Sequence, residues 1–229
     1  MMGVPYGCCN VLASALTFDK HTCNTYLKSY GVNVADSVML IRGMAYDVNE
    51  IINEVGLPCF VKPNAEGSSF GVTKVKEAAQ LEDALKKAFA LCREVLIETF
   101  IDGTELTCGV VKAGDMDITM PIAEVVPKNE FFDFEAKYDP TKSDEIIPAR
   151  ISPELTNRIK ILSSMIYDIL RCEGIIRVDY IVREDEIFML EVNTTPGMTS
   201  NSFVPKMVRA MGGTLREVLT KIIDNKLNR

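Results

Sequence analysis

The chain from Gly174 to Asn193 consists of two apolar runs that flank a charged turn at 183–186. Apolar runs on either side of a short polar turn predict a β-hairpin. If Asp179 lies opposite Glu191, one face of this hairpin is wholly apolar, and a slip of one residue would mix the two faces. The expected buried face consists of Val178, Tyr180, Val182, Phe188, Leu190 and Val192.

The other face of the predicted hairpin carries polar side chains. Arg177 then lies opposite Asn193, and both project beside Asp179 and Glu191, because side chains two apart on a strand point the same way. Two carboxylates and an amide oxygen suit Mg²⁺, and an arginine beside them suits a phosphoryl or carboxyl oxygen held by that ion. The alternative is an exposed sheet face with ordinary surface charge.

The residues that follow the hairpin favour the first interpretation. A Pro196-Gly197 turn leads into the hydroxyl residues Thr199, Ser200 and Ser202. Small hydroxyl residues pack poorly in a core but contact ligands well, and binding residues often lie on such loops.

The remaining pattern predicts a mixture of helices and strands. Helices are expected from Asp19 or Thr22 to Tyr30, after the Asp47 cap, over 77–92, over 152–174, after Ser202 and over 214–227. Strands are expected over 58–63, 72–75, 95–101, 105–111 and 117–126.

Charged residues interrupt several of these apolar elements. Lys62 ends an interior strand and therefore needs a partner. The Gly- and Ser-rich loop that follows, 64–71, suits phosphate binding through backbone N–H groups, although an ordinary hairpin loop explains it equally well. Lys20 opposes the dipole at a helix start, which hints at a ligand role, although a solvated lysine is the more common explanation for such a position. Glu98 and Glu105 interrupt strands, and an edge-strand surface charge is the alternative for Glu105.

Composition excludes several classes of protein. A net charge of −7 argues against a nucleic-acid binder, and the sequence contains no apolar run of the ~18 residues that a membrane span needs. Seven cysteines lie mostly in apolar stretches, which predicts reduced thiols in a cytoplasmic protein. With a single histidine, His21, the chemistry must depend on carboxylates, lysines, arginines and bound metal.

Taken together, these segments resemble the D-alanine–D-alanine ligases of the ATP-grasp superfamily. The resemblance covers about Val11 to Asn225, and its most distinctive runs are Glu135-Ala-Lys137-Tyr138 and Asn193-Thr-Thr-Pro-Gly-Met-Thr-Ser200. The other matching segments are Val61-Lys62-Pro63, Glu66-Gly-Ser-Ser-Phe-Gly71, Leu96-Ile-Glu98, Glu105, Arg177-Val-Asp179 and Glu191-Val-Asn193.

The resemblance implies an α+β, ATP-grasp fold in which two lobes hold the nucleotide between their sheets. Residues 19–104 would form the small central lobe and residues 105–229 the large C-terminal lobe. Residues 1–18 would be the junction to an N-terminal domain that this chain lacks, and Tyr6-Gly-Cys-Cys-Asn10 departs from the family pattern there. The chain is therefore expected to bind ATP and Mg²⁺ but to ligate poorly or not at all.

The resemblance also implies roles for individual residues in nucleotide binding. Lys20 and Lys62 would contact the phosphates, and Ser68 and Ser69 would cover them. Glu98, Thr99 and Ile101 would line the adenine slot, Glu105 would bind the ribose, Lys137 would reach the γ-phosphoryl and Tyr138 would lie on a mobile flap.

The implied metal and substrate residues lie in the C-terminal part. Asp179, Glu191 and Asn193 would hold two Mg²⁺ ions, for which Mn²⁺ can substitute. Arg177 and the Gly197 amide would stabilise the oxyanion, with Lys137, Tyr138 and Ser68 as further catalytic groups, and Ser202 and Phe203 would contact the second D-alanine.

The activity implied is ATP-dependent ligation of two D-alanines through a D-alanyl phosphate, for peptidoglycan precursor synthesis. Another ATP-grasp carboxylate–amine ligase and a non-catalytic ATP-binding remnant are the alternatives. Tyr138 favours an amine acceptor over a hydroxy acid within the family. Because members of this family tend to form homodimers, a homodimer is expected for this chain as well.

Overall fold

The computed structural model describes residues 4–66, 71–127 and 143–228. The chain divides into two compact units. Unit 1 contains residues 1–17, 104–126 and 145–229, and unit 2 contains residues 18–103 and 127–144. Unit 1 thus includes residues 1–17, and their interpretation as a junction to a further domain stays a prediction.

Unit 2 is built on a sheet with the strand order β1-β4-β2-β3. The strands are β1 (Ser37–Ile41), β2 (Cys59–Pro63), β3 (Thr73–Val75) and β4 (Glu94–Thr99), and each pairs antiparallel with its neighbour. The helices are α2 (Lys20–Lys28), α3 (Val48–Val55) and α4 (Leu81–Leu91), with a 3₁₀ turn, η1 (Ala78–Gln80), before α4. The hairpin predicted around the 64–71 loop is confirmed, since β2 pairs with β3.

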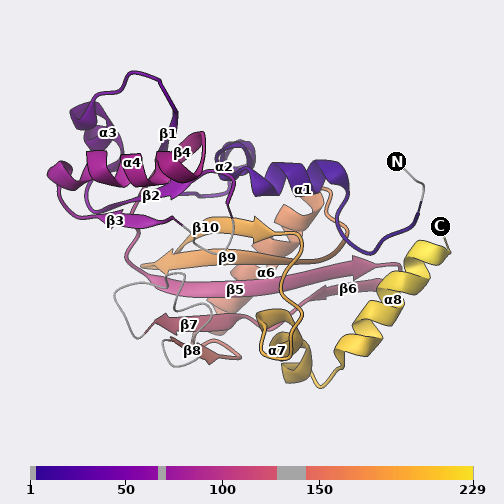
Figure 1. The fold of residues 1–229 in the computed structure, drawn as a ribbon. Helices are drawn as coiled ribbons and strands as arrows, with labels where there is room; N and C mark the ends of the chain where they lie inside the picture. Colours follow the sequence, from indigo (N-terminus) through magenta and orange to yellow (C-terminus); the bar gives the residue numbers. More distant parts are fainter. Residues whose placement is uncertain (1–3, 67–70, 128–142, 229) are drawn as a thin grey trace. The chain divides into compact units, whose positions relative to one another are not determined.

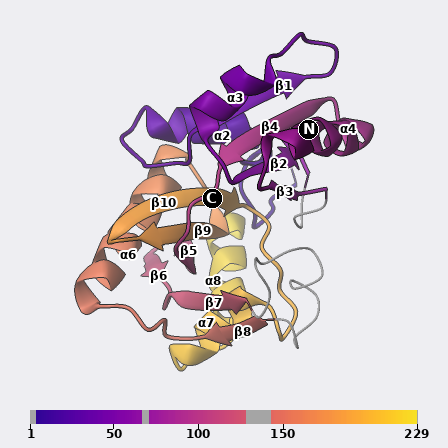
Figure 2. The same cartoon turned by 90° about the vertical axis from the view of Figure 1, so that its left-hand side faces the viewer.

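The two faces of this sheet are covered by different helices. One face packs against α3 and α4 (Figures 1 and 2). The core on that face includes Val61 and Ile97 from the sheet and Leu85 from α4. Glu98 points to the opposite face, where Asn24 of α2 contacts it. A buried carboxylate therefore lies between a strand and a helix in unit 2.

Polar residues cap the starts of several helices, as predicted for Asp47. Asp19 and Asp47 accept backbone N–H groups at the starts of α2 and α3. Ser152 accepts the Leu155 N–H at the start of α6 (Pro153–Ile169). Such caps stabilise a helix start by about 1 kcal/mol each, because they satisfy N–H groups that lack partners within the helix.

Unit 1 contains a second sheet, with the order β10-β9-β5-β7-β8 and with β6 paired to β5. Its strands are β5 (Thr104–Ala113), β6 (Met116–Thr119), β7 (Ala123–Pro127), β8 (Ser143–Ile146), β9 (Gly174–Arg183) and β10 (Glu186–Asn193). The prediction of one strand over 117–126 is wrong, because β6 and β7 are separate strands there. The edge-strand alternative for Glu105 is also wrong, since β5 pairs with both β7 and β9.

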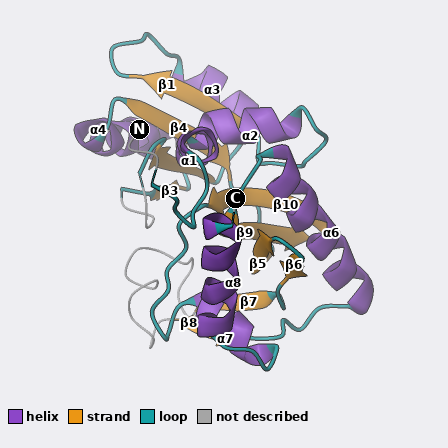
Figure 3. Ribbon diagram, turned by 90° about the vertical axis from the view of Figure 1, so that its right-hand side faces the viewer, coloured by secondary structure: helices purple, strands orange, loops and turns teal. Residues whose placement is uncertain are grey.

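Helices cover both faces of the unit 1 sheet, as Figure 3 shows for α6 on one side and for α7 (Phe203–Ala210) and α8 (Leu215–Leu227) on the other. On the α6 side, Ser163 Oγ and the buried Tyr180 hydroxyl are 2.7 Å apart. On the other side, Met207 and Ile222 pack against Ile175 of β9.

The helix α1 (Val11–Phe18) precedes α2. Within the described ranges, none of the helices is long and apolar enough to cross a membrane.

The β9–β10 hairpin has the predicted register, with Asp179 opposite Glu191 and Arg177 opposite Asn193. A bulge between Met189 and Glu191 interrupts the alternation. The buried residues of β10 are accordingly Ile187, Met189 and Val192, whereas Phe188 and Leu190 are half-buried. The prediction that Phe188 and Leu190 lie on the buried face is therefore wrong, because a bulge shifts the residues before it to the other face.

Candidate functional site

The carboxylate of Asp179 lies at the centre of the polar face of the hairpin. Its Oδ1 accepts hydrogen bonds from Thr107 Oγ1 at 2.5 Å and from Arg177 Nε at 2.8 Å. Its Oδ2 accepts from Arg177 Nη2 at 2.7 Å and from Asn193 Nδ2 at 3.0 Å. Asp179 is only 8% exposed, so water hardly reaches its carboxylate, and these donors supply the hydrogen bonds that water would otherwise make.

Arg177 is surrounded by negative charge. Its burial opposes the charged form, but Asp179, Glu191 and Glu105 outweigh that effect and raise the pKa of the guanidinium above its ordinary value. The guanidinium carbon also lies 5.5 Å from the ring centre of Phe203. Three carboxylates around one guanidinium leave an excess of negative charge, which favours a bound cation.

The oxygens on this face can hold a metal ion. Asn193 Nδ2 also contacts Glu191 Oε1 at 3.4 Å, so the side chains of Asp179, Glu191 and Asn193 converge. A flip of the Asn193 amide exchanges its oxygen and nitrogen, and a bound cation would favour the orientation that presents the oxygen. No group of three or more histidine, cysteine or acidic side chains is arranged as a metal site in the described parts of the chain. Two carboxylates and one amide are oxygen ligands of the kind that suit Mg²⁺, which takes its other ligands from water and phosphate.

The turn after β10 brings Gly197 and Ser202 together. A Cβ on Gly197 would lie 2.8 Å from Ser202 Oγ, so the hydroxyl would have to move to admit a larger residue. Ser202 precedes α7 but its side chain makes no capping hydrogen bond, and its hydroxyl lies 2.9 Å from Thr199 Oγ1. Phe203, the first residue of α7, stands beside Arg177. The predicted substrate residues thus share one region of unit 1.

A second polar cluster lies in unit 2, where Lys62 and Glu98 form a buried ion pair with side chains 14% and 7% exposed. Asn24 Nδ2 donates to the other Glu98 oxygen, Oε1, at 3.3 Å. The prediction that Lys62 needs a partner is confirmed. Thr99 Oγ1 donates to the Val55 carbonyl at 2.7 Å and so holds the end of α3. Ile101 is buried.

The start of α2 is attached to the segment that follows β2. Lys20 Nζ donates to the Glu66 carbonyl at 2.6 Å. The fully buried Asn64 accepts the His21 N–H at 2.9 Å through Oδ1 and donates to Glu94 Oε2 at 3.3 Å. These bonds hold Lys20 next to Glu66, in the loop predicted to bind phosphate.

Four of the predicted site residues, Ser68, Ser69, Lys137 and Tyr138, lie outside the described residues. Three polar residues at these clusters were not predicted, namely Thr107, Asn24 and Asn64. Thr107 lies two residues after Glu105, on the same face of a strand, and its buried hydroxyl could have been expected to need a partner there. The sequence carried no comparable signal for Asn24, because a polar residue on an amphipathic helix is usually exposed.

Comparison with known proteins identifies the class. The family model described as D-ala D-ala ligase C-terminus matches residues 26–224. The D-alanine–D-alanine ligase of Bacteroides fragilis (strain YCH46) is 56% identical over 227 residues, which are 99% of this chain and 70% of that protein. The D-alanine–D-alanine ligase of Porphyromonas gingivalis (strain ATCC BAA-308 / W83) is 50% identical over 230 residues, which are 100% of this chain and 69% of that protein.

Solved structures of ligases with similar sequences also superpose on this chain. The D-alanine–D-alanine ligase of Bacillus anthracis superposes with a TM-score of 0.87 at 33% identity, covering 99% of this chain and 73% of that one. VanG D-Ala:D-Ser ligase from Enterococcus faecalis superposes with a TM-score of 0.84 at 35% identity, covering 98% of this chain and 66% of that one. The α+β, ATP-grasp fold is therefore confirmed.

The chain belongs to the D-alanine–D-alanine ligase family. It spans about 70% of the length of the curated relatives it matches. The family predicted from the sequence is confirmed.

Proposed function

We propose that this protein takes part in the ATP-dependent joining of two D-alanines for peptidoglycan precursor synthesis. The observation that carries the proposal is the polar hairpin face of Arg177, Asp179, Glu191 and Asn193, in a chain 56% identical to a D-alanine–D-alanine ligase. ATP as the co-substrate is supported by the Bacillus anthracis ligase solved in complex with ATP, which superposes with a TM-score of 0.84 at 30% identity.

Lys20 and Lys62 bind the phosphates of ATP in this proposal. In the structure Lys62 is paired with Glu98, so a bound phosphate shares this lysine with a buried carboxylate. The backbone of Glu98, Thr99 and Ile101 lines the adenine slot, and Glu105 binds the ribose hydroxyls. Ser68 and Ser69 cover the phosphates, Lys137 reaches the γ-phosphoryl and Tyr138 belongs to a flap that excludes water.

Asp179, Glu191 and Asn193 hold two Mg²⁺ ions. When bound, the ions neutralise charge on the phosphoryl oxygens. Thr107 and Arg177 donate to the Asp179 carboxylate from two strands, so its oxygens keep a fixed orientation. Orientation by neighbouring hydrogen bonds is what a metal-binding carboxylate needs for high affinity.

The chemistry needs no nucleophile from the protein. A carboxylate oxygen of the first D-alanine attacks the γ-phosphorus of ATP, and ADP leaves. The amine of the second D-alanine then attacks the acyl phosphate carbonyl, and phosphate leaves after the amine loses a proton. Arg177 and the Gly197 N–H donate hydrogen bonds to the oxyanion, while Ser202 and Phe203 contact the second D-alanine.

The test is amino-acid-dependent ADP release by this chain across a panel of D- and L-amino acids, with the dipeptide detected by mass. Release stimulated by D-alanine, and lost in Arg177→Met, supports ligation of two D-alanines. Stimulation by a different acid or amine supports another ATP-grasp ligase. ATP binding without stimulated release would argue for a protein that binds the nucleotide without ligating amino acids.

We further propose a cytoplasmic location, where ATP is supplied, and a homodimer. Light scattering during size-exclusion chromatography measures the assembly directly. A mass of one chain at micromolar concentration would argue against the homodimer.

A further inference from the structure

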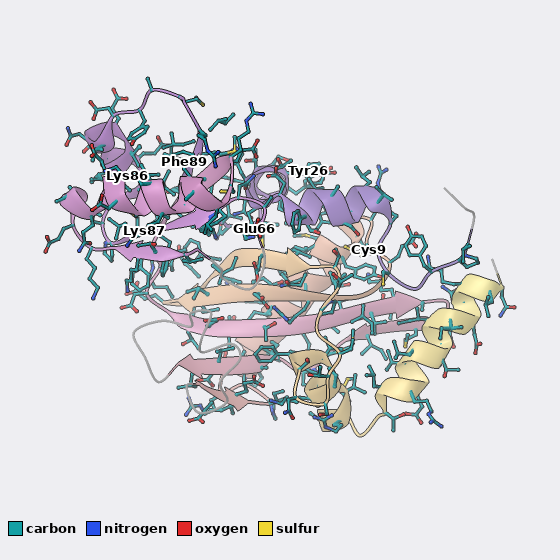
Figure 4. The ribbon with its side chains drawn as sticks, viewed as in Figure 1. Cys9, Tyr26, Glu66, Lys86, Lys87 and Phe89 are labelled. Carbon is teal, nitrogen blue, oxygen red and sulfur yellow. The ribbon has the colours of Figure 1, made fainter. Side chains whose placement is uncertain are left out.

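Two cysteines from distant parts of the chain meet in unit 1. Cys9 precedes α1 and is labelled in Figure 4, and Cys172 lies in the connection between α6 and β9. Cys9 Sγ donates to the Glu173 carbonyl at 3.2 Å and accepts the Glu173 N–H at 3.3 Å. A hydrogen bond with the side chain of Cys172 also lowers the pKa of the Cys9 thiol. The Cys9 sulfur is therefore held against the backbone of the residue next to Cys172.

Close backbone packing holds the two segments together. Gly174 has φ +68°, and a Cβ added there would collide with the Gly7 carbonyl oxygen. Asn10 Nδ2 donates to the Arg171 carbonyl at 3.3 Å. The segment before α1 thus lies directly on the α6–β9 connection on both sides of the two thiols.

The thiol of Cys9 differs from the other buried thiols. Its hydrogen bond with Cys172 lowers the pKa of Cys9, against the effect of burial, and the Glu173 N–H and the charge of Lys226 act in the same direction. Burial instead raises the pKa of Cys23 to about 12 and that of Cys108 to about 11. Because the thiolate is the reactive form, Cys9 is the better nucleophile among them.

A cavity of about 160 Å³ borders Cys172, the partner of Cys9. Cys172 forms part of its wall together with Tyr167, Glu173 and Lys226. Lys226 forms an ion pair with Glu173, and the Tyr167 hydroxyl donates to the Gly174 carbonyl at 3.1 Å. A water molecule occupies about 30 Å³ of liquid, so a small oxidant such as hydrogen peroxide fits in this cavity.

We propose that Cys9 and Cys172 form an oxidant-sensitive thiol pair that closes to a disulfide. The Cys9 thiolate attacks one oxygen of hydrogen peroxide, the O–O bond breaks, and hydroxide leaves to give a sulfenic acid. The Cys172 sulfur then attacks Cys9 Sγ, the S–O bond breaks, and the departing oxygen leaves as water. Two thiols and one peroxide become one disulfide and two waters, and an added dithiol reverses the reaction.

The disulfide would covalently join the segment before α1 to the α6–β9 connection. The exposed Cys8, next to Cys9, is the competing thiol. It could join Cys9 or Cys172, and the experiment separates these outcomes.

The test uses the full chain, reduced, desalted and exposed to hydrogen peroxide. Thiols that remain are alkylated after denaturation and counted by intact mass, and the cross-link is mapped by proteolysis. We expect the alkylated thiols to fall from seven to five, a Cys9–Cys172 cross-linked peptide, and recovery of all seven with dithiothreitol.

Two variants sharpen the result. Cys8→Ser should retain the cross-link, whereas Cys172→Ser should leave Cys9 as a sulfenic acid that dimedone traps. A disulfide that contains Cys8, or seven thiols after peroxide exposure, would overturn the proposal. Mapping in the unmodified chain decides the matter even if a variant does not fold.

Discussion

The hydroxyl of Thr107 donates a 2.5 Å hydrogen bond to Oδ1 of Asp179. The two residues lie opposite each other on the paired strands β5 and β9. Since Arg177 reaches Asp179 from the same strand, the carboxylate is oriented by two strands of the sheet. The proposed metal site is therefore held by residues that do not themselves need to touch the metal.

Replacing Thr107 with valine tests this arrangement. Thr107→Val keeps the branched shape but removes the donor, so we expect a loss of stability of about 1.5–3 kcal/mol, because hydrogen bonds to charged groups contribute in this range. We also expect Mg²⁺-dependent ATP binding to weaken about tenfold, as for other residues that orient metal ligands. Urea unfolding and calorimetric titration measure the two effects.

The matched control is Thr119→Val, at a half-buried position of β6 in the same unit. It should change stability by no more than about 0.5 kcal/mol and leave the Mg²⁺ dependence unchanged. An unchanged Mg²⁺ dependence in Thr107→Val itself would show that Asp179 needs no such support.

The buried Lys62–Glu98 pair in unit 2 allows a double-mutant cycle. Lys62→Met leaves a buried carboxylate without its cation and should cost about 3 kcal/mol. Adding Glu98→Gln removes that charge while keeping an acceptor for Asn24, so the double variant should be more stable than the sum of the single effects by about 1–3 kcal/mol.

An exposed pair in the same unit is the control for this cycle. Lys86 and Asp83 on α4 are 3.2 Å apart, with side chains 72% and 76% exposed, and Lys86 is labelled in Figure 4. Their coupling should stay within about 0.5 kcal/mol, because water screens such pairs. Strictly additive energies for Lys62 and Glu98 would contradict the buried ion pair.

The pairing of Asp179 with Glu191 could be predicted, because it gathers the polar residues of both strands on one face and leaves apolar residues for the other. The bulge before Glu191 could not be predicted, since Phe188 and Leu190 are as apolar as the Ile187 and Met189 that are buried instead. An apolar run on both faces of a strand contains no signal for where the alternation shifts.

The polar contacts were harder to predict than the strands. The need of Lys62 for a partner follows from its position on an interior strand, but the identity of that partner depends on which strands are neighbours. Glu98 is distant in sequence and becomes adjacent only because β4 pairs with β2. The same holds for Thr107, which reaches Asp179 only through the pairing of β5 with β9.

Part of the stability lost at low pH should come from Glu124. The side chain of Arg150 donates to both carboxylate oxygens, at 3.0 and 2.5 Å, and these bonds lower the pKa of Glu124 below its ordinary value of 4.5. A lowered pKa in the folded state means that the stabilisation is complete above pH 4.5 and is lost as the pH falls through the folded-state pKa.

Glu124→Gln should therefore be less stable than the unmodified chain at pH 7, and the difference should narrow below pH 4.5. Urea unfolding across this pH range measures the difference, and Arg150→Met should show the same narrowing. A difference that stays constant down to acid pH would contradict a role for this pair.

The turn of the β9–β10 hairpin leaves room for stabilisation. Glu184 and Asp185 have φ values of 49° and 67°, as in a type I′ turn, in which Asn-Gly is the preferred pair. Glu184→Asn combined with Asp185→Gly should raise the free energy of unfolding by about 1 kcal/mol, whereas Glu184→Val should lower it by a similar amount. Equal stability of the two variants would mean that the left-handed backbone costs nothing here.

The central claim is that the polar face of the β9–β10 hairpin binds the metal used with ATP. It is tested most directly by calorimetric titration of the chain with ATP, with and without Mg²⁺, together with Glu191→Gln and the control Glu186→Gln on the same strand. We expect Mg²⁺ to strengthen ATP binding in the unmodified chain and in Glu186→Gln, and to do so about tenfold less in Glu191→Gln. ATP binding that Mg²⁺ strengthens equally in all three proteins would contradict the claim.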